Sequence, residues 1–253
     1  MTDETGLSDR VALLWGRRHG ARRGPKPTLT VDDIIGAAVA VADADGLAAV
    51  SMARVAAQLG NSTMALYRHV KSKDELLLLM ADAALEDPPQ IPEGTDWRAA
   101  LQLWAHDVLA AVRRHSWYAQ IPISGPPVGP KNLAWFDRAL GALADTGLDE
   151  GDKVFVVMGL LTYVQGEARL SADLAAGFAA DPEAFSRQYS AALADVVDPQ
   201  RMPALRRVVE AGVFDADSLF EEEDVQTDFS FGLERYLDGV AVYIAEHTRP
   251  RGT

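Results

Sequence analysis

Hydrophobic residues recur at every third or fourth position along most of the chain, the spacing that gathers them on one face of an α-helix. In the first third of the chain this spacing predicts four short helices. They begin near Thr30, Ser51, Thr63 and Ser72. Ser and Thr side chains cap helix N-termini, and Gly46 and Gly60 follow the first two helices where a glycine C-cap is favoured. The pattern predicts a small helical domain at residues 28–75.

The rest of the chain, residues 76–250, also has helical spacing and forms the predicted larger domain. Further helices are expected at 96–115, 130–147, 150–173, 182–195, 201–212 and 227–247. Residues 122–130 contain four prolines and two glycines, a composition that predicts a loop. No segment alternates convincingly as a strand does. The sequence therefore predicts an all-α fold.

The second and third short helices, joined by a tight turn at Gly60, match a helix-turn-helix. In that motif the first helix lies across the DNA backbone and the second enters the major groove, which is wide enough for one α-helix. Leu66 and Val70 would then pack into the helical cluster. The side chains expected to face the DNA are Thr63, Met64, Tyr67 and Arg68.

Charge is distributed unevenly. The formal net charge is −13, yet residues 10–73 contain ten Lys or Arg and only four acidic residues. Residues 74–253 contain 14 basic and 30 acidic residues. A basic N-terminal quarter on an acidic body is expected when one end of a protein meets a polyanion, although such a stretch can also be a solubilising tail.

Residues 1–27 are predicted to be a flexible basic arm, because residues 10–27 mix arginines with glycines and prolines. Two interpretations remain open for this arm. It is either a solubilising tail or an extension that contacts the minor groove or the DNA backbone, and the second is favoured because the arm directly precedes the first helix. Its candidate DNA-contacting residues are Arg17, Arg18, Arg22, Arg23 and Lys26.

The run from Ser51 to Leu76, which includes LYRHVKSKDEL at residues 66–76, closely resembles the DNA-binding domain of the TetR family of repressors. A weaker resemblance to the tetracycline-repressor-like C-terminal domain continues through DWR at 96–98, RHSW at 114–117 and FGLERYLDG at 231–239. The resemblance implies a homodimer that binds a palindromic operator and is released by a small-molecule effector held in the helical body.

The resemblance also implies roles for single residues. Thr63, Met64 and Ala65 would contact base edges or methyl groups, and Tyr67, His69 and Lys73 would contact phosphates. The sequence departs from the family at Ala53, where some members have a basic residue, and at Arg68. The remaining expected DNA-contacting residues of this region are Ser51, Arg54 and Lys71.

In the body, aromatic and polar residues on apolar helices are candidates for an effector pocket, although aromatic residues at helical spacing more often belong to the core. The candidate ligand-binding residues are Trp104, His106, Trp135, Tyr163, Gln165 and Arg169. Residues 154–163 and 236–244 are apolar nearly all round. Such helices are buried on two sides, which favours a four-helix dimer interface built from these segments.

Several classes of protein are disfavoured. The chain has no cysteine, which excludes disulfides and thiol catalysis, and no cofactor or metal is expected because no ligand spacing is present. Its longest apolar run, residues 154–161, is far short of the roughly 20 residues of a membrane helix. We expect a cytosolic regulator rather than an enzyme. An all-helical enzyme and an effector-independent DNA-binding regulator remain the alternatives.

Overall fold

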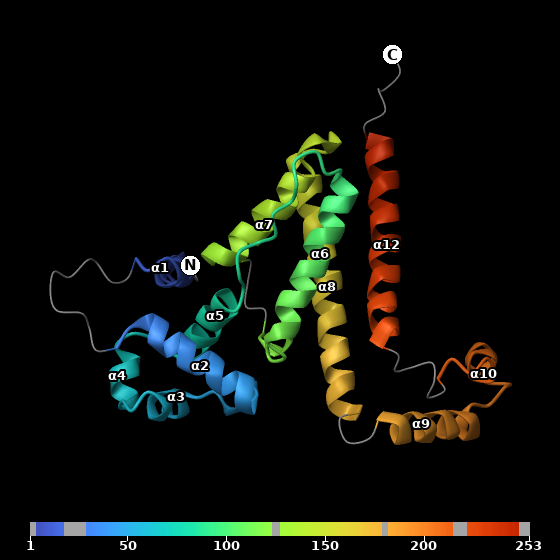
Figure 1. Cartoon of the computed structure of the whole chain (residues 1–253), viewed down its shortest axis with the longest axis horizontal. Coiled ribbons are helices and arrows are strands. Elements are labelled where there is room, and N and C mark those ends of the chain that lie inside the picture. The colour runs from blue at the N-terminus through green and yellow to red at the C-terminus, as the bar shows by residue number, and fades with distance from the viewer. Residues whose placement is uncertain (1–3, 18–28, 123–126, 179–181, 215–221, 248–253) are drawn as a thin grey trace, which may run out of the picture. The chain divides into compact units, whose positions relative to one another are not determined.

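The computed structural model describes residues 4–17, 29–122, 127–178, 182–214 and 222–247. Every regular element in these ranges is a helix, so the predicted all-α class is confirmed. The elements are α1 Glu4–Leu14, α2 Val31–Asp45, η1 Leu47–Ala49, α3 Met52–Gln58, α4 Thr63–Tyr67, α5 Lys73–Ala83, α6 Trp97–Arg114, η2 Tyr118–Gln120, α7 Pro130–Ala142, η3 Ala144–Thr146, α8 Glu150–Phe178, α9 Pro182–Val196, α10 Pro203–Glu210 and α12 Glu222–His247 (Figure 1). None of the described helices has the length and apolar character needed to cross a bilayer.

The chain divides into two compact units, residues 1–165 with 247–253 and residues 166–246. The division falls inside α8. The first unit contains α1 to α7 and the first half of α8. In the second unit, α9 and α10 pack on each other and enclose a small cavity of about 250 Å³.

The helix starts were predicted well because local hydrogen bonds determine them. Thr30 caps α2 in a capping box: its hydroxyl accepts from the Asp33 N–H at 3.1 Å, and the Asp33 carboxylate accepts from the Thr30 N–H at 2.8 Å. The Thr30 hydroxyl also donates to the Asp33 carboxylate at 2.6 Å. This bond, followed by the one from the Thr30 N–H, lowers the pKa of the Asp33 carboxyl. Ser51 and Ser72 cap α3 and α5 as expected.

The N-terminal domain, here α2 to α5, has a closed apolar core. Ile34, Val55, Leu66 and Leu76, one from each helix, are completely buried. Leu29 and Ala84, which flank this region, also belong to the core, and two further side chains come from other elements. One is Leu13 of α1, and the other is Trp117, which lies just beyond α6.

The structure of α1 differs from the predicted arm. Residues 4–14 form a helix, Leu13 is 4% exposed within the core, and a turn continues through residue 17. The prediction of flexibility was wrong for this part, because it was based on the arginines, glycines and prolines of residues 10–27 and gave no weight to the apolar run at residues 11–14. Residues 18–27 of the predicted arm lie outside the described residues.

The second outside contribution to the core is Trp117, which is completely buried. Its indole Nε1–H donates to Oδ1 of Asp43 in α2 at 2.6 Å. The same oxygen lies 2.7 Å from Nδ1 of His115, the C-cap residue of α6. The end of α6 is therefore embedded in the N-terminal domain by an apolar ring and two polar contacts.

Tyr118, next to this ring, provides a test of the packing. Burial raises the pKa of Tyr118 to about 12, and the Asp82 carboxylate adds to the effect. The folded protein thus holds the phenol proton more tightly than the unfolded chain does. We expect the free energy of unfolding to be independent of this group below about pH 10 and to fall as the pH rises towards 12. Urea unfolding between pH 9 and 11 should show a fall that is smaller in Tyr118→Phe; equal slopes would contradict the assignment.

Candidate nucleic-acid interface

The helix-turn-helix is formed by α3, the turn at residues 59–62 and α4. Gly60 has φ of +63°, a left-handed conformation that strains other residues, so a glycine suits the turn. The Asn61 side chain donates to the Leu59 carbonyl at 2.9 Å. The hydroxyl of Ser62 accepts from the Ala65 N–H at 3.3 Å and caps α4. These contacts fix the angle at which α4 leaves α3.

The two faces of α4 are as the sequence predicted. Leu66 and Val70 are completely buried, which confirms that they point into the cluster. The opposite face is open: Met64 is 70% and Tyr67 43% exposed, and Arg68 is exposed as well. Helix α4 is shorter than expected, because Arg68 is already its C-cap residue. A short, cationic and partly apolar face of this kind fits a major groove, where methyl groups and base edges alternate.

Around α4, further candidates line the same part of the domain. Lys73 is the first residue of α5 and is exposed, as is Lys71. Exposed amines beside a helix N-terminus favour a phosphate, because the unpaired N–H groups there also attract anions. Ala65 and His69 are half-buried, and Ser51 is exposed but already accepts from the Arg54 N–H.

An ion pair that sequence reasoning missed involves one of the candidates. The Arg54 guanidinium lies 3.0 Å from the Asp45 carboxylate, and the side chains are 56% and 46% exposed. The pair joins α3 to the last residue of α2, nine positions earlier. Exposed pairs of this kind contribute little to stability, so Arg54 can exchange its carboxylate for a phosphate at small cost.

Of the five predicted DNA contacts of the basic arm, Arg17 lies within the described residues. Arg17 is exposed, with its guanidinium 5.7 Å from the Trp15 ring centroid. The other four predicted arm contacts, Arg18, Arg22, Arg23 and Lys26, lie outside the described residues.

The six predicted ligand-binding residues have different surroundings. Trp104 and Trp135 are 1% and 5% exposed and donate their indole N–H groups to backbone carbonyls, Trp104 to that of Trp135 and Trp135 to that of Glu86, each at 2.8 Å. Their packing and hydrogen bonds give them a structural role. His106, Tyr163 and Gln165 are half-buried and stay candidates.

Arg169 is exposed on α8, with Nε 3.7 Å from the Asp173 carboxylate. The cavity between α9 and α10 is lined by none of the six; its lining residues are Ser190, Ala191, Leu193, Ala194, Val209 and Phe214. The ligand assignment is thus still a prediction.

Comparison with known proteins decides the family. A family profile described as "Bacterial regulatory proteins, tetR family" matches residues 34–80, and one described as "Tetracyclin repressor-like, C-terminal domain" matches residues 88–244. The chain belongs to the TetR family. Among TetR-family relatives, it is 36% identical to the HTH-type transcriptional repressor DrrR1 of Streptomyces coeruleorubidus, over 97% of this chain and 90% of that protein.

Solved TetR-family structures have the same fold. The chain is similar to ActR from Streptomyces coelicolor in complex with actinorhodin, with a TM-score of 0.72 and 26% identity over 86% of this chain and 99% of that one. Apo ActR is similar with a TM-score of 0.71 and 25% identity, over 86% and 99% of the two chains. A helix-turn-helix domain and a helical body are therefore shared with TetR-family regulators.

Proposed function

We propose that the chain is a transcriptional repressor that binds a palindromic operator as a homodimer in the cytoplasm and is released by a small-molecule effector. The observation that supports DNA binding most directly is that α4 has one buried face and one exposed face. Leu66 is buried against the core, while Met64, Tyr67 and Arg68 are exposed on the other side. This arrangement presents a groove-sized helix to solvent, and no other segment among the described residues covers its open face.

Homodimerisation is supported by an exposed apolar stripe on α8. The stripe has three-and-four spacing along the helix and consists of Phe155, Met158, Thr162, Gly166, Leu170 and Leu174, all exposed. Phe155 alone is 75% exposed. An ideal Cβ on Gly166 would meet nothing within 4 Å, so a second helix can approach closely there. A second copy of the chain is the partner that we propose for this stripe.

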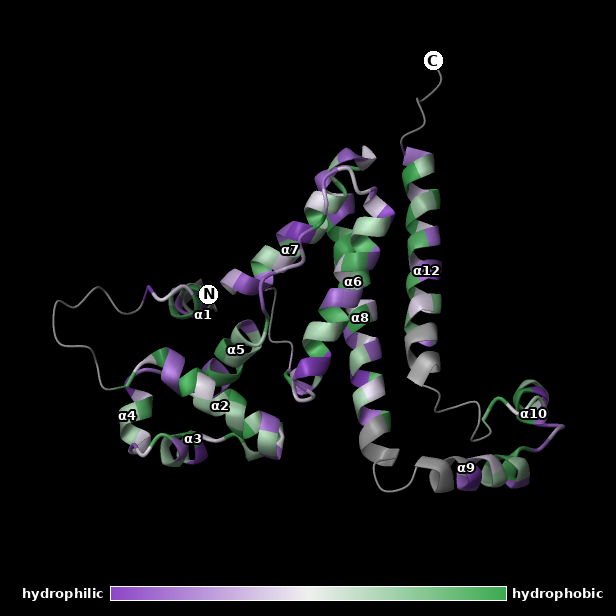
Figure 2. Cartoon of the chain, viewed as in Figure 1, coloured by the Kyte–Doolittle hydropathy of each residue, from purple (hydrophilic) through white to green (hydrophobic). Residues whose placement is uncertain are grey.

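Helix α12 has a similar stripe, and apolar residues recur along its length (Figure 2). Phe231 and Val242 are 64% and 59% exposed, with Gly239 between them on the same face. The Arg235 guanidinium lies 5.3 Å from the Phe231 ring centroid. We propose that this stripe also pairs with the second copy, since a twofold axis buries the same patch on both subunits.

The proposal that this chain binds an effector is supported by solved structures of a relative. ActR, at 25–26% identity, has been solved with actinorhodin and with (S)-DNPA. We propose that the body of this chain holds a small molecule as well, with His106, Tyr163 and Gln165 as the half-buried candidates. Actinorhodin is the first probe to use.

The test begins with selection of duplex DNA by the full chain from a random pool. We expect a palindrome with half-sites about one helical turn apart, bound by two chains. Actinorhodin, or a molecule that is retained on purification and seen by native mass spectrometry, should weaken that binding. Failure to enrich any sequence would refute operator binding. If a DNA sequence is enriched but no ligand weakens its binding, the chain would be a regulator that acts without an effector.

Two substitutions separate recognition from charge. Lys73→Ala should weaken binding to all sequences alike and lower the slope of log affinity against log salt by about one, because one phosphate contact is lost. Arg68→Ala should instead relax the preference at one base position, with about 1–3 kcal/mol less discrimination. Fluorescence anisotropy over a salt series, with the selected duplex and single-base variants, measures both. An unchanged slope of log affinity against log salt in Lys73→Ala would show that Lys73 does not contact a phosphate.

A further inference from the structure

The last turn of α5 and the first turn of α7 cap each other. Helix α7 begins after Gly129, which has no side chain to cap the free N–H groups of the first turn. Asp82 of α5 does so instead. Its Oδ1 accepts from the backbone N–H and from the side-chain Nδ2 of Asn132, both at 3.0 Å. A carboxylate from one helix thus occupies the positive end of another.

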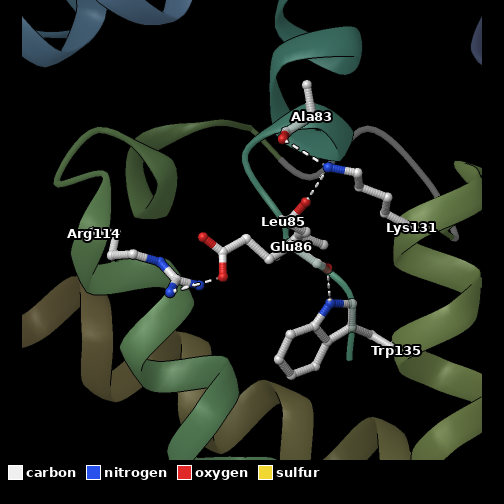
Figure 3. Close-up of polar contacts among 6 residues, drawn as sticks. All are labelled: Ala83, Leu85, Glu86, Arg114, Lys131 and Trp135. Carbon is white, nitrogen blue, oxygen red and sulfur yellow. Dashed lines mark hydrogen bonds and ion pairs between the residues drawn. The ribbon is translucent and has the colours of Figure 1, made fainter. Parts of the chain in front are cut away.

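The return contact comes from Lys131, the preceding residue of α7. The Lys131 ammonium donates to the carbonyl of Ala83, the last residue of α5, at 3.2 Å and to that of Leu85, two residues beyond it (Figure 3). Further along α7, the Trp135 indole donates to the Glu86 carbonyl. Cations are favourable at helix C-termini, so each helix supplies the charge that the other helix end attracts.

The fit around Asp82 is tight. The residue is 8% exposed, and the contacts described for its carboxylate come from residues 131 and 132 of α7. A Cβ at position 129 would lie 2.1 Å from Oδ1, so the carboxylate reaches α7 because this residue is a glycine. A buried carboxylate without its donors is costly, which ties the position of α5 to that of α7.

The end of α6 is attached differently. Trp117 lies inside the core of the N-terminal domain, so it is bound to move with that domain. Helix α7 instead meets α5 through directional hydrogen bonds. Leu66 of α4 and Leu76 of α5 belong to the same buried core, so a displaced α5 displaces α4. The Trp15 indole N–H also donates to the Val128 carbonyl, just before α7, at 2.9 Å. The exchanged caps are the contact by which α7 holds α5 itself.

We propose that Asp82 is a positioning residue that couples the start of α7 to the recognition helix through these exchanged caps. This inference rests on the proposed DNA-binding function. Coupling between two sites is reciprocal: if a change at α7 alters DNA affinity, DNA binding must alter the state of α7. The operator can therefore serve as the probe, and no effector is needed.

The experiment is amide hydrogen exchange of the full chain with and without the selected duplex, followed in a peptide that covers residues 128–133. In the wild type we expect DNA to slow exchange there by about fivefold or more, although α4 is the element on the DNA. Asp82→Asn should still bind DNA and lose this DNA dependence. Glu86→Gln is the matched control, because its ion pair with Arg114 at the same joint is exposed and should not transmit the effect.

A merely structural role for Asp82 would give a different result. In Asp82→Asn, the exchange rate at residues 128–133 would then rise by the same factor with and without DNA. The ratio of the rate without DNA to the rate with DNA would equal the wild-type ratio, and this result would overturn the inference. If Asp82→Asn does not fold, the same comparison is made with Lys131→Met. This variant removes the hydrogen bonds from Lys131 to the end of α5 and leaves Asp82 in place. A wild type that binds DNA without any change at 128–133 also overturns the inference. A wild type that selects no DNA refutes the proposed function before any variant is made.

Discussion

Trp117→Ala should lower the free energy of unfolding of the N-terminal domain by about 3–5 kcal/mol, the range for removing a fully buried tryptophan. The side chain is completely buried, between α2 and the end of α6, and its indole N–H is bonded to Asp43. The substitution leaves a cavity and strands this carboxylate without one of its donors. Urea unfolding followed by circular dichroism measures the loss, and DNA binding should weaken in parallel as the domain unfolds.

Trp117→Phe separates the two contributions. Phenylalanine keeps most of the apolar ring and removes only the N–H donor to Asp43, a partly exposed carboxylate. We expect a loss of about 1 kcal/mol from the hydrogen bond, well below that of the alanine variant. Equal losses in both variants would show that the hydrogen bond, rather than the packing, holds α6 to the domain.

Phe155→Arg should convert the proposed dimer into monomers. Burying a phenylalanine contributes about 2 kcal/mol, and a twofold interface buries two copies, so its loss weakens association by about 4 kcal/mol or roughly a thousandfold. Two like charges facing each other add to this. Sedimentation velocity at micromolar concentration reports the change directly, and operator affinity should fall with it because both half-sites are needed.

Phe155→Leu is the control, since it keeps an apolar side chain on the α8 stripe. It should remain dimeric with a modest loss of affinity. A wild type that is monomeric at the same concentration, or an arginine variant that stays dimeric, would show that this stripe of α8 does not join the two copies.

The parts of the fold that follow from local chemistry could be predicted from the sequence. Thr30, Ser51 and Ser72 cap helices as expected, since a cap joins residues two or three positions apart. The buried positions of α4 followed from its spacing. The family signature at residues 66–76 added the expected function, which no periodicity could provide.

Long-range contacts were not predictable in this way. Helix α1 has its apolar residues mainly in one short run, and Leu13 is buried because the core of the N-terminal domain accepts it. Nothing in the sequence around Asp82 marks it as a cap, yet it caps a helix through residues 49 and 50 positions away. Trp104 and Trp135 were ligand candidates by residue type, but their N–H groups bond to backbone carbonyls. In each case the deciding partner is distant in sequence.

The Arg54–Asp45 ion pair has a consequence for how the protein would search a chromosome. In the free domain a carboxylate neutralises this guanidinium, so one fewer cation is available to any passing duplex. Because the pair is exposed and contributes little to stability, a phosphate of any bound duplex can replace the carboxylate at small cost. Arg54 would then act as a general backbone contact whose net gain is reduced by the loss of its own carboxylate, and it would add little to the choice between sequences.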